Sequence, residues 1–197
     1  MTETGDLLFC VVGSDSNLIS SVEAGYKGAR LNHVGVAIDL YDTMFVLEAI
    51  APMVRLIPLT AYRKQSRISP SGPERIMSAR LNAPYRHLIP PAISYGMRQL
   101  ALPYDSFFMP DQAALYCSEL IVDMFRHANG GAEFFRETPM SFSDPVTGEI
   151  LPGWINYYEA FGLEVPEDEP GSHPGEISLD PRITIYDVTE AVPGYQP

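Results

Sequence analysis

Apolar residues in the first sixty positions follow the patterns of β-strands. Residues 7–12 (LLFCVV) form a continuous apolar run, which is typical of a buried strand. In residues 33–40 (HVGVAIDL) apolar residues alternate with small or polar ones, as expected of a strand that presents different faces at successive positions. A turn at 41–43 leads into 44–50 (MFVLEAI), which we expect to pair back on the preceding strand, and 54–59 (VRLIPL) is a candidate for a further strand.

Three segments have the pattern of helices. Residues 17–28 follow the N-cap candidates SDSN and end at a glycine, and residues 91–102 precede a proline. The clearest segment is 117–128 (CSELIVDMFRHA), whose apolar residues recur at helical spacing. The sequence NGG at 129–131 then ends the pattern, as is common just past a helix C-terminus.

The remaining segments are more irregular. Residues 62–82 are polar and basic and contain Pro70, Gly72 and Pro73, so we expect a solvated loop or connector there. The Pro- and Gly-rich segment 164–182 predicts an ordered loop that wraps the domain, and 182–188 (RITIYDV) predicts one more strand. No internal repeat is visible. The sequence therefore predicts one α+β domain over residues 1–197.

Composition narrows the class of protein. The chain has 197 residues, 46% of them hydrophobic and 19% charged, which is ordinary for a globular protein. Its net charge of −12 argues against nucleic acid and anionic membrane surfaces as partners and suits a cationic or zwitterionic substrate better. The N-terminus lacks a basic signal region, and no apolar run approaches the ~20 residues of a membrane span. We therefore expect a cytoplasmic protein without stable membrane association. Nothing in the sequence fixes its oligomeric state.

Cys117 is the first candidate for chemistry, because it lies at the start of the amphipathic helix 117–128. Unpaired N–H groups and the positive end of the helix dipole favour a negative charge there, and therefore the thiolate form of a cysteine. The alternative is that Cys117 is a buried cysteine that packs like a small hydrophobic residue. With only one other cysteine, Cys10, no disulfide framework is indicated.

A nucleophilic thiol needs a base, and the chain has four histidines. His127 lies on the cysteine's own helix but ~15 Å along it, too far to reach the thiol, and suits the negative end of that helix. His87 and His173 are predicted to be surface residues. None of the histidines has a metal-ligand spacing to another histidine or to a cysteine, so the sequence predicts neither a metal site nor a cofactor. His33, at the head of a predicted strand, is the remaining candidate.

Glu48 is a plausible partner for His33. Its carboxylate lies in an otherwise apolar strand, where it is costly unless it is paired. If His33 lies opposite Glu48, or opposite Ile50 with Glu48 one step along, the carboxylate faces the imidazole. A slip of one residue would turn the carboxylate to the other face of the sheet. On its own face of the strand, His33 has the small neighbours Gly35 and Ala37, which leave room for another group to approach.

At this point the sequence resembles a known family. The order of four short motifs is similar to that of the YiiX/YebB-like group, a circularly permuted branch of the NlpC-type papain-like cysteine amidohydrolases and peptidases. The motifs are GDLLF at 5–9, NHVGVAI at 32–38, LEAI at 47–50, and LPYDSFF with LYCSELIVDMF between 102 and 125. The loop GSHPGEIS also resembles a tail feature of some members.

The resemblance implies a permuted papain-like fold, with an antiparallel sheet packed against helices that include the nucleophile helix. It implies that Cys117 is the nucleophile, His33 the general base and Glu48 the third member of a triad. Three further residues are expected near the substrate: Tyr104, Asp105 and Ser118. The chain departs from the expected pattern at Cys10, which directly follows GDLLF and puts the pocket wall in question.

The function implied is hydrolysis of an amide bond in a small peptide or amino-acid-containing substrate, through an intermediate in which Cys117 carries the acyl group. One alternative is a lipid acyltransferase or thioesterase of the same permuted fold, similar to the lecithin–retinol acyltransferase relatives. The other is a ligand-binding domain without turnover.

Overall fold

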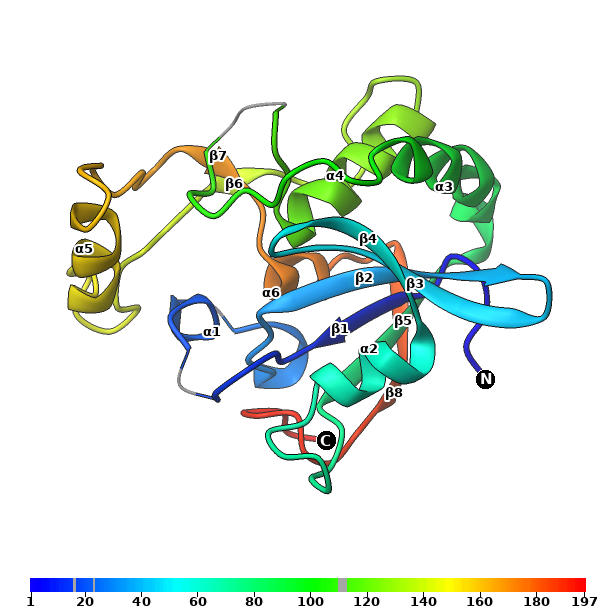
Figure 1. Cartoon of the computed structure of the whole chain (residues 1–197), viewed down its shortest axis with the longest axis horizontal. Coiled ribbons are helices and arrows are strands. Elements are labelled where there is room, and N and C mark those ends of the chain that lie inside the picture. Colours follow the sequence, from blue (N-terminus) through cyan, green and yellow to red (C-terminus); the bar gives the residue numbers. More distant parts are fainter. Residues whose placement is uncertain (16, 23, 110–112) are drawn as a thin grey trace.

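A computed structural model describes residues 1–15, 17–22, 24–109 and 113–197 of the chain. Its centre is a six-stranded antiparallel sheet with the strand order β4-β3-β2-β1-β5-β8 (Figure 1). The strands are β1 (Leu7–Cys10), β2 (His33–Leu40), β3 (Thr43–Ile50), β4 (Met53–Pro58), β5 (Ile76–Leu81) and β8 (Ile183–Val188). The strand patterns in the sequence therefore predicted five of these six strands to within a few residues.

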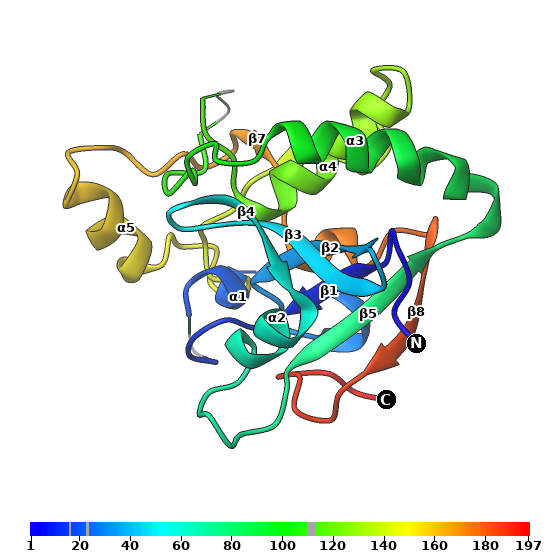
Figure 2. The same ribbon diagram turned by 45° about the vertical axis from the view of Figure 1, so that its right-hand side comes forward.

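Helices cover both faces of the sheet. On one face, α3 (Ile89–Arg98) and α4 (Cys117–Ala128) lie side by side, as Figure 2 shows. Their apolar residues pack on alternate positions of the central strands, and Val34 and Val36 of β2 belong to this core. On the other face, α2 (Leu59–Gln65) packs its buried Tyr62 against a smaller core. The two cores follow from the alternation of side chains along each strand.

The segment after α4 adds short elements outside the main sheet. They are β6 (Thr138–Pro139), α5 (Pro152–Glu159), β7 (Pro170–Gly171) and α6 (Pro174–Ile177). Figure 1 shows α5 away from the sheet, where Trp154 and Tyr158 form a third, aromatic core with Phe142. The segment is thus mainly irregular and well packed, as its composition predicts.

Two predicted helices are shorter than expected. In place of a helix over 17–28, the structure has α1 (Ile19–Val22) and a 3-10 turn (Tyr26–Gly28). Gly25 is extended and closely packed there, since a Cβ atom on it would lie 2.5 Å from the hydroxyl oxygen of Ser178. The helix predicted over 91–102 ends at Arg98, because the backbone of Ala101 and Leu102 pairs with Val54 of β4 instead.

The prediction of a loop over 62–82 holds only for residues 66–75 and was wrong for the two ends of the segment. This segment contains the end of α2, a second 3-10 helix (Ala83–Leu88) follows it, and its last residues form β5, which pairs with β1 in the middle of the sheet. Basic residues misled the prediction because Arg75 is only 2% exposed. Its guanidinium forms an ion pair with Asp15 and donates to the carbonyls of Ser66 (2.7 Å) and Gly13 (2.8 Å). A buried arginine therefore ties the loop after β1 to the loop before β5.

We predict that Arg75→Met lowers the free energy of unfolding by about 3 kcal/mol, because it leaves the buried carbonyl of Ser66 without its donor and removes the bond to Gly13 and the ion pair with Asp15. Chemical denaturation of the variant and the wild type measures the difference. Arg98→Met is the matched control, since Arg98 is exposed and its hydrogen bonds to Ser94 and His127 are exposed as well. It should change the free energy of unfolding by less than about 1 kcal/mol. Equal losses in the two variants would contradict this role of Arg75.

Candidate active site

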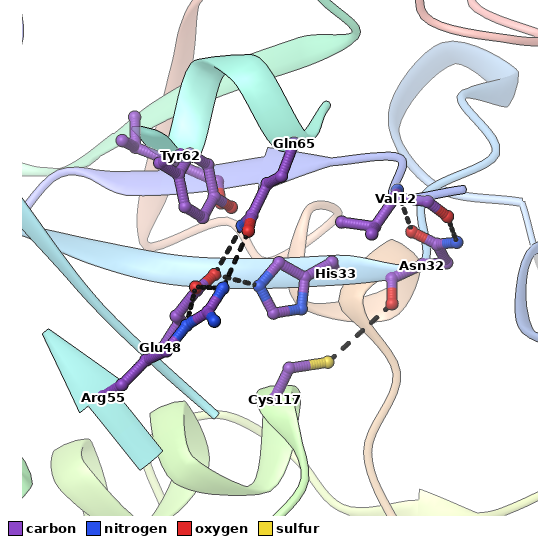
Figure 3. A network of polar contacts seen from close by, with 9 residues as sticks. Val12, Asn32, His33, Glu48, Arg55, Tyr62, Gln65 and Cys117 are labelled. Carbon is purple, nitrogen blue, oxygen red and sulfur yellow. Dashed lines mark hydrogen bonds and ion pairs between the residues drawn. The ribbon is translucent and has the colours of Figure 1, made fainter. Parts of the chain in front are cut away.

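His33 and Glu48 meet inside the sheet. The β2–β3 register pairs Val36 with Leu47, and its continuation sets His33 opposite Ile50 with Glu48 one step along. This is the second of the two favourable registers considered from the sequence. The imidazole Nε2 lies 2.6 Å from Glu48 Oε2, and the two residues are 4% and 0% exposed (Figure 3).

Cys117 reaches the other side of the same imidazole. It is the first residue of α4, and its sulfur lies 3.8 Å from the backbone carbonyl of Asn32, the residue before His33. In Figure 3 the ring of His33 lies between Glu48 and Cys117. Since Nε2 is bound to Glu48, Nδ1 is the ring nitrogen free to exchange a proton with the thiol.

The charges around His33 favour its protonated form. Burial alone would lower the pKa of His33, but its hydrogen bonds to Cys117 and Glu48 raise that pKa to about 9. For Glu48, burial opposes ionisation, but the bonds from His33, Gln65 and Arg55 prevail and its pKa is lowered. The site therefore holds an imidazolium against a carboxylate at neutral pH.

Two adjoining cavities open at these residues. One, of about 190 Å³, has Cys117 in its wall and is lined mainly by apolar and aromatic side chains, among them Ile19, Phe108, Met140, Phe142 and Trp154. The second has His33 in its wall, together with Tyr104 and Tyr157. Asn32 borders both cavities, so the thiol and the imidazole face adjacent parts of one cleft.

The other residues expected near the substrate differ in position. Tyr104 lines the cavity on the His33 side, and Ser118 lines the cavity on the Cys117 side while its hydroxyl donates to the carbonyl of Ser172 (2.9 Å). Asp105 lies in neither wall. Its carboxylate is buried and accepts a bond from the backbone N–H of Phe107 (2.8 Å), which indicates a role in holding this loop.

Cys10 does not form part of the cleft wall. It is fully buried with Tyr62 in the core under α2, and burial raises the pKa of its thiol well above the ordinary range. Cys10 therefore behaves as a small hydrophobic residue of the core, the role that was considered as the alternative for Cys117. The departure from the family pattern at Cys10 therefore does not alter the wall of the cleft.

The prediction that His87 and His173 lie at the surface holds for one of them. His87 and His127 are exposed. His173 is not a surface residue: it lies in the wall of the Cys117 cavity, where its Nδ1 accepts from the N–H of Gly175 and its Nε2 contacts the carbonyl of Ile19 (3.0 Å). Burial lowers its pKa to about 4, so the ring is neutral at physiological pH. Pro and Gly around His173 suggested exposure, whereas they form the tight N-terminus of α6.

The sequence reasoning missed Asn32, Arg55 and Gln65. Arg55 carried a signal, since β3 and β4 pair Glu48 directly with it and opposite charges across strands attract. The side-chain amide of Asn32 accepts from the N–H of Val12 (2.8 Å) and donates to the carbonyl of Val12 (2.9 Å). These two bonds hold the residue that directly precedes His33. Gln65 gave no signal, because its role depends on how α2 lies on the sheet.

The residues that the structure describes contain neither a cluster of metal ligands nor a helix suited to crossing a membrane. Within 1–15, 17–22, 24–109 and 113–197, no cluster of three or more His, Cys, Asp or Glu side chains is placed to hold a metal ion. In the same ranges, no helix has the length and apolar character required to cross a bilayer.

An antiparallel sheet whose early strand carries a histidine, against a later helix that begins with a cysteine, defines a papain-like cysteine hydrolase in permuted order. The chain belongs to the YaeF/YiiX, C92 family of permuted papain-like amidases, whose sequence model matches residues 1–184. The resemblance seen in the sequence and the predicted fold class are thus confirmed.

A crystal structure described as that of the metalloprotein YiiX from Escherichia coli O157:H7 has the same fold. The TM-score is 0.74 at 19% sequence identity, and the match covers 95% of this chain and 98% of that one. No curated protein sequence matches the chain.

The raised pKa of His33 predicts a pH dependence of stability. The folded protein holds the imidazole proton more tightly than the unfolded chain, whose pKa is near 6.5, so this contribution is complete below pH 6.5. It is lost as the pH rises to about 9. We expect the free energy of unfolding of the wild type to fall across this window, and the His33→Gln variant to show a smaller fall. Parallel curves from denaturant titrations at several pH values would rule out the raised pKa.

Proposed function

We propose that the protein is a cysteine amidase or peptidase that cleaves an amide bond of a small peptide or amino-acid-containing substrate. Cys117 is the nucleophile, His33 the general base and acid, and Glu48 the group that orients and stabilises the imidazolium. The observation that carries the proposal is the placement of one buried imidazole between a carboxylate and a helix-N-terminal thiol. Membership of an amidase family supports the class of reaction.

The reaction has two halves. His33 already holds the proton as an imidazolium, and the Cys117 thiolate attacks the amide carbonyl carbon. The tetrahedral intermediate expels the amine, which takes the proton from His33, and leaves a thioester on Cys117. Water then attacks this thioester, His33 accepts a proton from the water, and the acid leaves as the Cys117 thiolate and the His33 imidazolium are restored. The backbone N–H of Cys117, at the start of α4, is suited to bind the oxyanion.

The geometry also suggests how the substrate lies. Because His33 protonates the departing amine, the amine part belongs on the His33 side of the cleft, next to Tyr104. The acyl part then belongs on the Cys117 side, where Ser118 is part of the wall.

A resident metal does not fit the site. The E. coli protein of similar fold is described as a metalloprotein, but no cluster of three or more metal-ligating side chains occurs among the residues that this structure describes. The proposed steps therefore use only the chain's own residues.

One observation favours a second candidate, an acyltransferase or thioesterase. The cavity beside Cys117 is lined mainly by apolar side chains, which suits an apolar acyl group. The same thiol would accept the acyl group from an ester or thioester in place of an amide. Hydrolysis of p-nitroanilides compared with esters of the same acyl groups, together with liposome binding, separates the two candidates.

We predict that Cys117→Ala abolishes both the iodoacetamide labelling at near-neutral pH and any hydrolysis by the protein. The reason is that the other cysteine, Cys10, is buried and its thiol has a raised pKa. Mass spectrometry of the labelled protein identifies the modified residue. Cys10→Ala is the control and should keep both activities. Labelling that persists in Cys117→Ala, or that maps to Cys10, would reject the proposal, and unchanged ligand binding without hydrolysis in the wild type would favour a binding domain.

A further inference from the structure

Glu48 of β3 forms a closed ring of hydrogen bonds with Arg55 of β4 and Gln65 of α2. Its Oε1 lies 2.8 Å from both Nε and Nη2 of Arg55, on the neighbouring strand β4. Its Oε2 accepts from Gln65 Nε2 of α2 at 2.7 Å as well as contacting His33. Arg55 Nη2 also donates to Gln65 Oε1 at 2.9 Å, which completes the ring (Figure 3).

The amide of Gln65 is suited to this position because it is both donor and acceptor. Its N–H points at the carboxylate and its carbonyl oxygen at the guanidinium, so the orientation of the amide is determined by its two partners. A charged side chain at position 65 could satisfy only one of them. Gln65 is the last residue of α2, so the position of this helix is coupled to the orientation of Glu48.

Each oxygen of Glu48 has a distinct set of partners. Arg55 occupies Oε1 and leaves Oε2 to face His33, while Gln65 prevents the carboxylate from rotating about its last bond. With 0% exposure, Glu48 cannot use water in place of these donors. An ionised carboxylate in such a place is costly unless it is paired and hydrogen-bonded.

We propose that Arg55 and Gln65 are positioning residues for the reaction: Arg55 keeps Glu48 ionised, and the two together hold its Oε2 against His33. The proposal rests on the proposed function of Cys117 and His33. Neither residue touches the thiol or the cleft, so both act through Glu48. An ordinary stabilising ion pair is the alternative, since the side chain of Arg55 is 36% exposed and exposed pairs contribute little beyond stability.

Few other charges act on Glu48. Cys10 of β1 and Tyr62 of α2 feel its charge, but burial raises the pKa of both groups above the range of an ordinary titration. Cys117 of α4 lies beyond the imidazole ring. The titration of Glu48 should therefore respond chiefly to His33, Arg55 and Gln65. Loss of either donor should raise the pKa of Glu48, since the hydrogen bonds from both residues lower it.

The experiment uses the full chain with Arg55→Met and Gln65→Leu. In each variant Glu48 should gain its proton at a higher pH, and the imidazolium loses its partner when that happens. We expect the acid limb of the pH profile for iodoacetamide labelling of Cys117 to move to higher pH, with a rate about tenfold lower on that limb. Arg55→Lys keeps the charge but lacks the planar fork that reaches both Glu48 and Gln65, so it should restore only part of the rate.

NMR of the His33 ring gives a measurement that does not depend on catalysis. The His33 signal is assigned by its loss in His33→Gln, and its acidic inflection reports the titration of Glu48. This inflection should move to higher pH in Arg55→Met and Gln65→Leu and move less in Arg55→Lys, which keeps the charge but loses the fork. Because the two side chains bond to each other, their effects in the double variant should be smaller than the product of the single effects.

Arg63→Met is the matched control. Arg63 lies on α2, like Gln65, and its side chain is 46% exposed. Its ion pair is with Glu74 and not with Glu48. It should leave both the labelling profile and the His33 inflection unchanged. Equal shifts in Arg63→Met, or altered stability of Arg55→Met and Gln65→Leu without any shift, would overturn the proposal. If wild-type Cys117 is not labelled, the proposed function fails, while the NMR inflections still decide the roles of Arg55 and Gln65.

Discussion

The contact between His33 and Glu48 is the constraint on which the rest of the site depends. A carboxylate with 0% exposure exists in this sheet because an imidazole and a guanidinium share its charge. The same contact fixes which nitrogen of His33 faces Cys117. Because both partners are on paired strands, the backbone hydrogen bonds of the sheet set their separation before any substrate arrives.

The site combines residues from both faces of the main sheet. His33, Glu48 and Arg55 point to the face covered by α2, whereas α4 packs against the opposite face. Cys117 reaches the imidazole because His33 is the first residue of β2 and Cys117 the first residue of α4. The thiol thus lies at an edge between two cores, where the helix N-terminus is close to the cleft. This position gives the sulfur a cavity on one side and a buried imidazole on the other.

Individual residues show how far the sequence could be interpreted. The alternation in 33–40 and 44–50 predicted the two strands, and the cost of a buried carboxylate singled out Glu48. The prediction of exposure failed for Arg75 and His173. A basic residue and a histidine among prolines were both expected at the surface, whereas Arg75 is buried and His173 is partly buried. In each case a backbone carbonyl far away in sequence is among the partners: that of Gly13 for Arg75 and that of Ile19 for His173. Such partners leave no trace in the local pattern.

The sequence by itself determined five of the six strands of the main sheet, the cysteine helix and the three residues of the proposed site, because periodicity and burial cost act on neighbouring residues. Only the tertiary structure decided the register between His33 and Glu48, the approach of Cys117 across 84 positions of chain, and the place of Gln65 beside the carboxylate. These depend on how whole strands and helices pack, and a shift of one residue in a strand pair would reverse the face on which Glu48 lies.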